Sequence, residues 1–201
     1  MKKLLTFAVI VVVLFPSCAK KEQAKEAIST VPVSALERSL ASVKDSVGKK
    51  DYAGAWLALR SSLEAFWGET PLLINNPRFV TTENNTFGIY TPKEGEDFSS
   101  GEVIHLYCEP AGYSVRKNAE GQYEFAFKAD FSLEDESGKV LGGQKDFANL
   151  NFKSWNFNTE VALTFTFTFS GLEKVKYKIV TMVRDANSEK SASLTKVFSI
   201  I

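Results

Sequence analysis

The hydrophobic pattern of the chain has a helical period between residues 34 and 68. Apolar side chains recur there every three or four positions, which places them on one face of a helix. They form two stripes, first Leu36, Leu40, Val43 and Val47, and then Tyr52, Trp56, Leu59, Leu63 and Phe66. Two amphipathic helices joined by a turn of a few residues predict an antiparallel hairpin.

Residues that favour helix ends mark the limits of both predicted helices. Ser34 and Glu37 match a capping box, in which the two side chains accept hydrogen bonds from free N–H groups at a helix start. Asp51 is a suitable cap for the second helix. Gly48 and Gly68 follow the two apolar stripes, where glycine commonly ends a helix. The pattern therefore predicts a hairpin over residues 34–68.

The tryptophans of the hairpin allow two interpretations. Trp56 and Trp67 fit the helical spacing, so we expect them to be core or docking residues. The alternative is a peptide-binding groove, because residues 49–62 resemble half of a tetratricopeptide-type repeat. No second copy follows in the sequence, and a solenoid needs about three repeats for stability.

After residue 82 the hydrophobic period changes to two. Alternating runs, each with one apolar and one polar face, are typical of antiparallel sheets with one solvated side. The runs are Phe87–Tyr90, Glu102–Glu109, Gln122–Phe131, Val161–Phe169, Val175–Val183 and Leu194–Ile200. About seven strands with no helical stretch between them predict an antiparallel β-sandwich over residues 83–201. Residues 69–82 are expected to be an extended connector between hairpin and sandwich.

One segment of the sandwich resembles a known family. Leu172, followed by Tyr177-Lys178-Ile179, resembles the tyrosine corner and F strand of immunoglobulin-like and fibronectin-type domains. The resemblance implies a mostly β, immunoglobulin-like antiparallel sandwich preceded by a short α-helical hairpin. It implies no activity, because a fold does not fix a function.

The first residues have the pattern of an export signal. Lys2 and Lys3 precede an apolar run, Leu4–Phe15, which is shorter than the roughly 20 residues that a membrane span needs. The sequence from Leu14 to Cys18 then resembles the bacterial lipobox. The resemblance implies a signal peptide over residues 1–17, a lipidated Cys18 carrying acyl chains such as palmitate, and a flexible tether over residues 18–33.

The residue after the lipobox cysteine bears on location. Ala19 is not the aspartate that retains enterobacterial lipoproteins in the inner membrane. The resemblance therefore favours a lipid-anchored protein of the cell envelope, more specifically of the outer membrane, facing the periplasm.

Charge excludes one class of partner. The chain has 24 basic and 24 acidic residues, so no basic excess is present to hold a phosphate backbone. We expect no nucleic-acid partner. The partners expected are the membrane, through lipid on Cys18, and a protein of unknown identity.

The usual catalytic groups are sparse. His105 and Cys108 are three residues apart on a predicted strand, so they point to opposite faces and cannot share a metal ion or act as a nucleophile pair. Cys108 is expected to be a buried free thiol. No Gly-x-Ser-x-Gly or glycine-rich phosphate motif occurs. We therefore expect that the protein is not an enzyme and that it binds no cofactor and no metal.

Acidic turns leave two alternatives open. Asp135 and Asp185 lie in predicted turns, and they could meet at one end of the sandwich and bind calcium through oxygen ligands. A hydrolase would instead need two carboxylates about 5–10 Å apart in one cleft.

Four aromatic residues are candidates for ligand or partner contact: Tyr90, Tyr107, Tyr113 and Trp155. Flat rings on a rigid sandwich can anchor a protein or stack on sugars. The glycan-binding alternative requires Trp155 and at least one of Tyr107 and Tyr113 to be exposed together. The structural alternative is that Trp155, Phe152 and Phe157 cover the sandwich end or hold the hairpin. The sequence as a whole favours a non-catalytic, membrane-anchored module for protein interaction or assembly.

Overall fold

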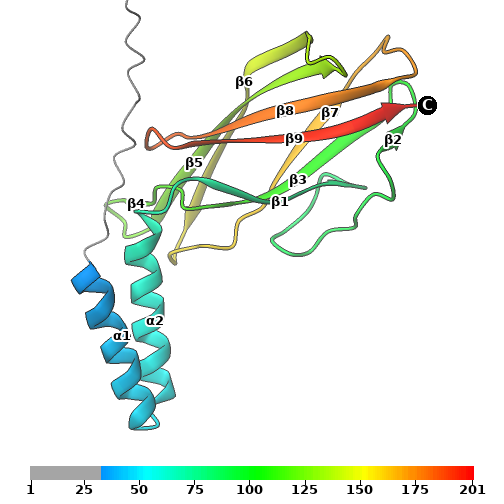
Figure 1. The fold of residues 1–201 in the computed structure, drawn as a ribbon. Helices are drawn as coiled ribbons and strands as arrows, with labels where there is room; N and C mark the ends of the chain where they lie inside the picture. The colour runs from blue at the N-terminus through cyan, green and yellow to red at the C-terminus, as the bar shows by residue number, and fades with distance from the viewer. Residues whose placement is uncertain (1–32) are drawn as a thin grey trace, which may run out of the picture.

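The computed structural model describes residues 33–201, and their side chains from residue 36 onward. An α-helical hairpin projects from one end of a β-sandwich (Figure 1). The predicted signal peptide, Cys18, the tether up to residue 32 and the capping side chain of Ser34 lie outside the described part. The fold is mostly β with a helical hairpin at its amino-terminal side, as predicted.

The hairpin consists of α1 (Val33–Gly48) and α2 (Tyr52–Trp67), which run side by side (Figure 1). Asp51 is the N-cap of α2, and its Oδ1 accepts a hydrogen bond of 2.9 Å from the backbone N–H of Gly54. This bond satisfies one of the free N–H groups of the first helical turn. The predicted limits of both helices are confirmed to within a residue.

The sandwich has two sheets. The smaller has the strand order β1 (Leu73–Val80), β3 (Val103–Ala111) and β7 (Leu163–Thr168). The larger has the order β2 (Asp97–Phe98), β9 (Ser191–Ile200), β8 (Lys176–Asp185), β5 (Tyr123–Asp135) and β4 (Arg116–Lys117), with β6 (Val140–Ser154) also paired to β5. All pairs are antiparallel except the short β2–β9 pair.

The predicted tyrosine corner is present at the start of β8. Tyr177 is buried, and its hydroxyl donates a 3.1 Å hydrogen bond to the backbone oxygen of Glu173, four residues upstream. This bond is the defining contact of that motif in immunoglobulin-like sandwiches. The structure thus contains the local contact that the resemblance implies, within a mostly β, sandwich-like fold.

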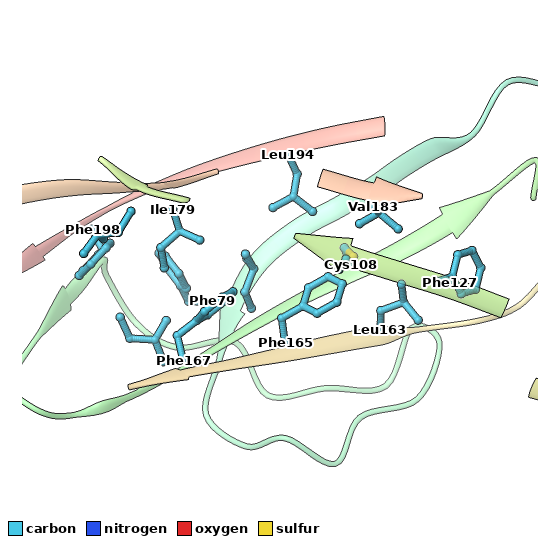
Figure 2. Close-up of a cluster of buried hydrophobic side chains, with 14 of the residues drawn as sticks. Phe79, Cys108, Phe127, Leu163, Phe165, Phe167, Ile179, Val183, Leu194 and Phe198 are labelled. Carbon is cyan, nitrogen blue, oxygen red and sulfur yellow. The ribbon is translucent and has the colours of Figure 1, made fainter. Parts of the chain in front are cut away.

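The core lies between the two sheets and is rich in phenylalanine. Figure 2 shows side chains from both sheets meeting there, with Phe165 and Phe167 of β7 opposite Ile179 and Val183 of β8. Along β3, β5, β7, β8 and β9 the inward-pointing residues are mainly apolar, because successive side chains of a strand leave on opposite faces. The alternating apolar side chains from which the sandwich is predicted are therefore the ones that fill its interior.

Three local predictions are wrong. The connector contains strand β1, so the sandwich begins at Leu73 rather than at residue 83. Residues 87–90 form no strand; a tight turn brings Thr86 and Ile89 into an isolated bridge. Most of the stretch 149–159, interpreted as a loop, is the end of β6, whose Asn149–Ser154 pairs with Tyr123–Lys128 of β5.

Candidate functional site

The helical hairpin carries the largest group of exposed apolar side chains. On α1, Leu36, Leu40 and Val47 are 37–52% exposed. On α2, the corresponding residues are 44–68% exposed: Tyr52, Trp56, Leu59, Leu63 and Phe66. We call these eight side chains the hairpin face. Contiguous exposed apolar surface of this kind marks interaction sites in soluble proteins.

The two helices cannot bury these side chains by packing on each other alone. In α2 the only buried residues are Ala55 and Trp67. Ala55 is small, so its burial removes little apolar surface from water, whereas the large side chains of the same helix remain half-exposed. A two-helix hairpin lacks the third or fourth helix that closes the core of a bundle.

A groove of about 470 Å³ lies between α2 and the loop that connects β6 to β7. Its apolar lining comes from three residues of the hairpin face and one residue of the loop, namely Trp56, Leu59, Leu63 and Phe157. Polar and charged side chains complete it: Arg60, Glu64, Asn158, Thr159 and Glu160. The groove extends the hairpin face onto the sandwich, and its lining combines apolar with polar and charged side chains, as protein interfaces do.

A buried junction fixes the hairpin to the sandwich. The indole N–H of Trp67 donates a 2.9 Å hydrogen bond to the backbone oxygen of Tyr113, and the hydroxyl of Tyr113 donates a 2.6 Å bond to the backbone oxygen of Asn158. The Trp67 ring packs edge-on against Tyr113 and Phe157. Burial raises the pKa of the Tyr113 hydroxyl, so this donor stays protonated. Trp67 is thus a docking residue, as predicted, whereas Trp56 is exposed.

Hydrogen bonds to backbone carbonyl oxygens strengthen the same junction. The ammonium group of Lys190 donates to the carbonyl oxygens of Gly68 (2.7 Å) and Gly112 (2.8 Å), which ties the end of α2 to the sandwich. Gly112 has φ +76°, and a Cβ there would lie 2.3 Å from the Pro71 oxygen. Only glycine allows this approach, so the chain following α2 is held tightly against the sandwich.

The predicted aromatic candidates do not form one exposed platform. Tyr107 and Tyr113 are fully buried, Tyr90 is partly buried, and Trp155 is 72% exposed in the bend after β6. The arrangement required by the glycan-binding alternative is therefore absent. Of the residues in the structural alternative, Phe152 and Phe157 pack against the core and Trp155 does not.

Tyr107 belongs to a buried polar cluster on β3. Its hydroxyl donates a 2.6 Å hydrogen bond to Glu109, whose second carboxylate oxygen accepts a 2.6 Å bond from the Asn76 amide. Burial, followed by the bond to Glu109, raises the pKa of Tyr107 to about 12. The Tyr90 ring packs on Tyr107 at 4.5 Å between centroids and receives the Arg78 guanidinium on its face. Tyr90 and Tyr107 thus serve packing rather than ligand contact.

His105 and Cys108 lie on opposite faces of β3, as predicted. Nδ1 of His105 is 3.0 Å from the Thr166 hydroxyl, while Cys108 is buried in the core and is a free thiol. Burial, followed by the charge of Glu109, raises the pKa of Cys108 to about 12. Within residues 33–201, no three His, Cys, Asp or Glu side chains gather as metal ligands.

The acidic turns are not neighbours, which contradicts the calcium hypothesis. In the β5–β8 pair, Asp135 is opposite Tyr177 and Asp185 is opposite Phe127. This register separates the two aspartates along the sheet by about 26 Å at ~3.3 Å per residue. Asp185 instead accepts hydrogen bonds from its own turn and from the Ser114 N–H. The separation follows from strand pairing, which turn composition does not reveal.

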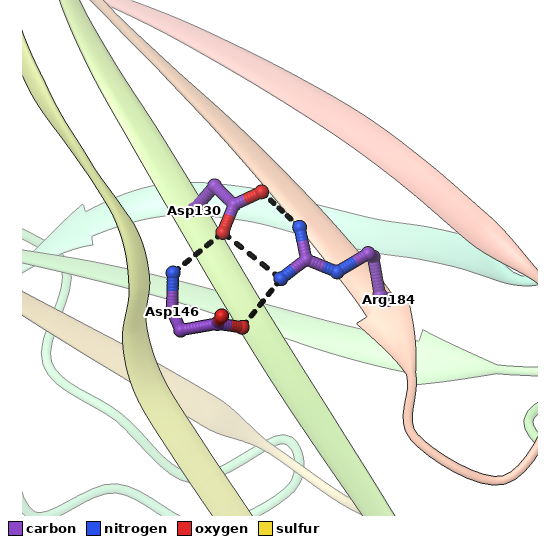
Figure 3. Close-up of polar contacts among 3 residues, drawn as sticks. All are labelled: Asp130, Asp146 and Arg184. Carbon is purple, nitrogen blue, oxygen red and sulfur yellow. Dashed lines mark hydrogen bonds and ion pairs between the residues drawn. The ribbon is translucent and has the colours of Figure 1, made fainter.

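Two other carboxylates, Asp130 and Asp146, share Arg184 on the outer face of the larger sheet (Figure 3). Asp130 binds both terminal nitrogens of the guanidinium, and it also accepts a 2.6 Å bond from the Asp146 N–H. The hydrogen bonds from Arg184 hold the pKa of Asp130 below its ordinary value of 3.8. An ionised, paired carboxylate of this kind is unsuited to be the proton donor of a hydrolase.

The same ion pairs stabilise a bulge in β6. Between the Ala129–Ala148 and Phe131–Gln144 pairs, β6 has three residues opposite one residue of β5, and Asp146 has φ +48°. The bulge brings Phe147 against Phe131 and Phe167. Bulges and charged residues on an edge strand hinder pairing with another sheet, so the edge of β6 is a poorer interaction site than the hairpin face.

Comparison with known proteins gives little for function. No family model and no curated protein matches the chain. It is similar to the crystal structure of Spo0M, a sporulation control protein from Bacillus subtilis, with 10% identity, TM-score 0.34, and coverage of 65% of this chain and 49% of that one. It is also similar to the Pseudomonas fluorescens alkylpurine DNA glycosylase AlkC bound to DNA with an abasic site analog, with 9% identity, TM-score 0.32, and coverage of 71% and 38%.

The chain thus spans about half the length of Spo0M and less of AlkC. Neither similarity carries a functional argument. Separately, neither helix within residues 33–201 has the length and apolar character needed to cross a bilayer.

Proposed function

We propose that this chain is a non-catalytic lipoprotein of the cell envelope, anchored by lipid on Cys18, whose hairpin face is a protein-interaction surface. The observation that carries the proposal is the hairpin face itself: eight large apolar side chains, half-exposed, on a hairpin locked to a folded sandwich. A flexible hairpin could fold its apolar side onto the sandwich. The Trp67 junction opposes that rearrangement, so the face stays available to a partner.

The chemistry of the described side chains supports a non-catalytic role. The single histidine of the sequence contacts Thr166, the Cys108 thiol is buried, and Asp130 and Asp146 are both ion-paired with Arg184. Each of these groups thus has a structural partner or no access to solvent.

The amino-terminal sequence supports the anchor. The lipobox pattern implies acylation at Cys18, and several acyl chains give durable membrane attachment where one does not. The absence of aspartate at position 19 favours the outer membrane, facing the periplasm. The tether predicted over residues 18–33 would then link the anchor to the hairpin and sandwich, which it would present to proteins of that compartment.

Metabolic labelling tests the anchor. In a bacterial host supplied with alkynyl palmitate, the wild-type protein is expected to carry the label and to sediment with membranes. Cys18→Ser removes the acylated thiol, so label and sedimentation should both be lost. Label retained on Cys18→Ser would contradict the assignment of the lipidation site.

Site-specific photo-crosslinking tests the interaction surface. A photoreactive amino acid at Leu63 of the membrane-anchored protein is expected to give a discrete protein adduct. The matched control is Val197, an exposed valine on β9 of the sandwich. Equal or absent crosslinking at both positions would remove the proposal that the hairpin face binds protein.

A further inference from the structure

We propose that the hairpin face binds the hairpin face of a second copy of this chain, so that two hairpins form a four-helix bundle. The inference rests on the proposed function, because it names the partner of the same surface. It follows from the area, shape and charge of the hairpin.

The exposed area matches what a stable dimer needs. The hairpin face is 37–68% exposed over its eight side chains. With fully exposed residues of roughly 170–280 Å², these fractions leave on the order of 900 Å² open on each copy, compared with about 800 Å² per partner in a standard interface. A contact between two copies could therefore bury a full interface from these side chains alone.

The shape of the hairpin favours a helical partner of equal length. Both helices have 16 residues, which corresponds to about 24 Å of length. The exposed apolar side chains of each helix recur every three or four residues, so they form a stripe along one face of the hairpin rather than a single spot. A second hairpin supplies the missing neighbours.

The charge of the hairpin permits self-association. Residues 36–67 carry five basic side chains, Arg38, Lys44, Lys49, Lys50 and Arg60, and four acidic ones, Glu37, Asp45, Asp51 and Glu64. Several already pair within the hairpin, as in Lys49–Asp45 and Arg60–Glu64. Two such surfaces do not repel each other, and neither offers the strong field that would select a highly charged partner.

A symmetric contact makes the proposal easy to test. In a two-fold interface, residues near the axis lie close to the same residues of the other copy. Leu59 and Leu63 are near the middle of α2, so they are the best positions for a disulfide between copies. The background is low, since the sequence has two cysteines, of which Cys108 is buried and Cys18 is expected to carry lipid.

The experiment uses the full-length, membrane-anchored protein. Leu59→Cys and Leu63→Cys are each expected to give a disulfide-linked species of twice the chain mass on non-reducing gels of isolated membranes. Val197→Cys, with 39% exposure against 48% for Leu63, is the matched control. We expect at least tenfold more crosslinked dimer from the hairpin positions than from the control.

A second measurement does not depend on introduced cysteines. Native mass spectrometry of the detergent-solubilised wild type should give the dimer mass. Leu63→Glu should give the monomer with unchanged circular dichroism, and Val197→Glu should remain a dimer.

A monomeric wild type with no dimer band from either cysteine position would overturn the proposal. If the Leu63 photo-crosslinker still gave an adduct with a different protein, the proposed function would survive with another partner. If the face gave no adduct at all, both proposals would fail. A monomer whose Leu59→Cys thiol is shielded from maleimide would place residues 19–32 on the face, which also overturns the dimer.

Discussion

The close approach of Gly112 to Pro71 gives the sharpest test of the junction. Gly112→Ala places a methyl group at φ +76° and 2.3 Å from the Pro71 oxygen. The left-handed conformation costs about 1 kcal/mol for alanine. The overlap requires movement of the backbone that follows α2, and strain of this kind costs about 1–3 kcal/mol more. We therefore expect a loss of about 3 kcal/mol in the free energy of unfolding.

A second glycine separates the two contributions. Gly101 has φ +77°, nearly the same conformation, but a Cβ there meets no atom within 4 Å. Gly101→Ala should therefore lose only the conformational part, about 1 kcal/mol. The difference between the variants, about 2 kcal/mol, measures the close approach itself.

Urea and thermal unfolding of the purified variants give both numbers. For a domain of this size, 1 kcal/mol corresponds to a shift of about 2–4 °C in Tm, so Gly112→Ala should melt about 6–12 °C lower than wild type. If Gly112→Ala and Gly101→Ala agree within about 0.5 kcal/mol, the chain after α2 is not held against the sandwich as described.

Three further predictions follow from single side chains. The hydroxyl of Thr181 is buried without a hydrogen-bond partner, so Thr181→Val should raise the free energy of unfolding by about 1 kcal/mol in urea unfolding. A lower free energy of unfolding would mean that the hydroxyl has a partner. Asp130 has a lowered pKa in the folded state, so its pairing with Arg184 stabilises above pH 3.8 and is lost as the pH falls below it. The stability deficit of Asp130→Asn should accordingly be constant from pH 5 to 7 and shrink below about pH 4, and a deficit independent of pH would refute this assignment. Cys108, whose pKa burial raises to about 12, should react with a thiol reagent only after unfolding, whereas rapid labelling of the native protein would show the core to be open.

The sequence predicts those parts of the fold that depend on local periodicity. The spacing in α1 and α2 and the alternation in β3, β5, β7, β8 and β9 are set by which face each segment buries, so a single chain reveals them. Asp51 and the Tyr177 corner are also local signals, with partners three and four residues away. Both contacts are present in the structure, and both could be predicted because their partners lie close together in the sequence.

The wrong predictions depend on contacts between distant segments. The sequence of β1 has no regular alternation of apolar and polar residues, and the strand has a bulge between Asn75 and Arg78. Its strand structure therefore becomes evident only from its pairing with β3. In β6, residues 140–146, up to and including the bulge at Asp146, are all exposed, so this part of the strand has no alternating buried face. The period reappears only after the bulge.

The candidate site was only partly accessible from sequence. The spacing of the hairpin face is evident, but an apolar stripe is equally compatible with burial, and only the structure shows these side chains half-exposed. Tyr113 lies outside every alternating run, so the sequence predicts a surface ring there. Its real partners, Trp67 and Asn158, are 46 and 45 residues away, and no local pattern encodes them.

Hydroxyl-radical footprinting of two tryptophans in intact membranes tests the central claim most directly. Trp56 on the hairpin face and Trp155 on the sandwich are 64% and 72% exposed in the single chain, so they should oxidise at similar rates when the chain is alone. We predict that in membranes Trp56 is protected severalfold relative to Trp155, and that Leu63→Glu restores its oxidation. Equal oxidation of the two indoles in wild-type membranes would mean that no protein covers the hairpin face.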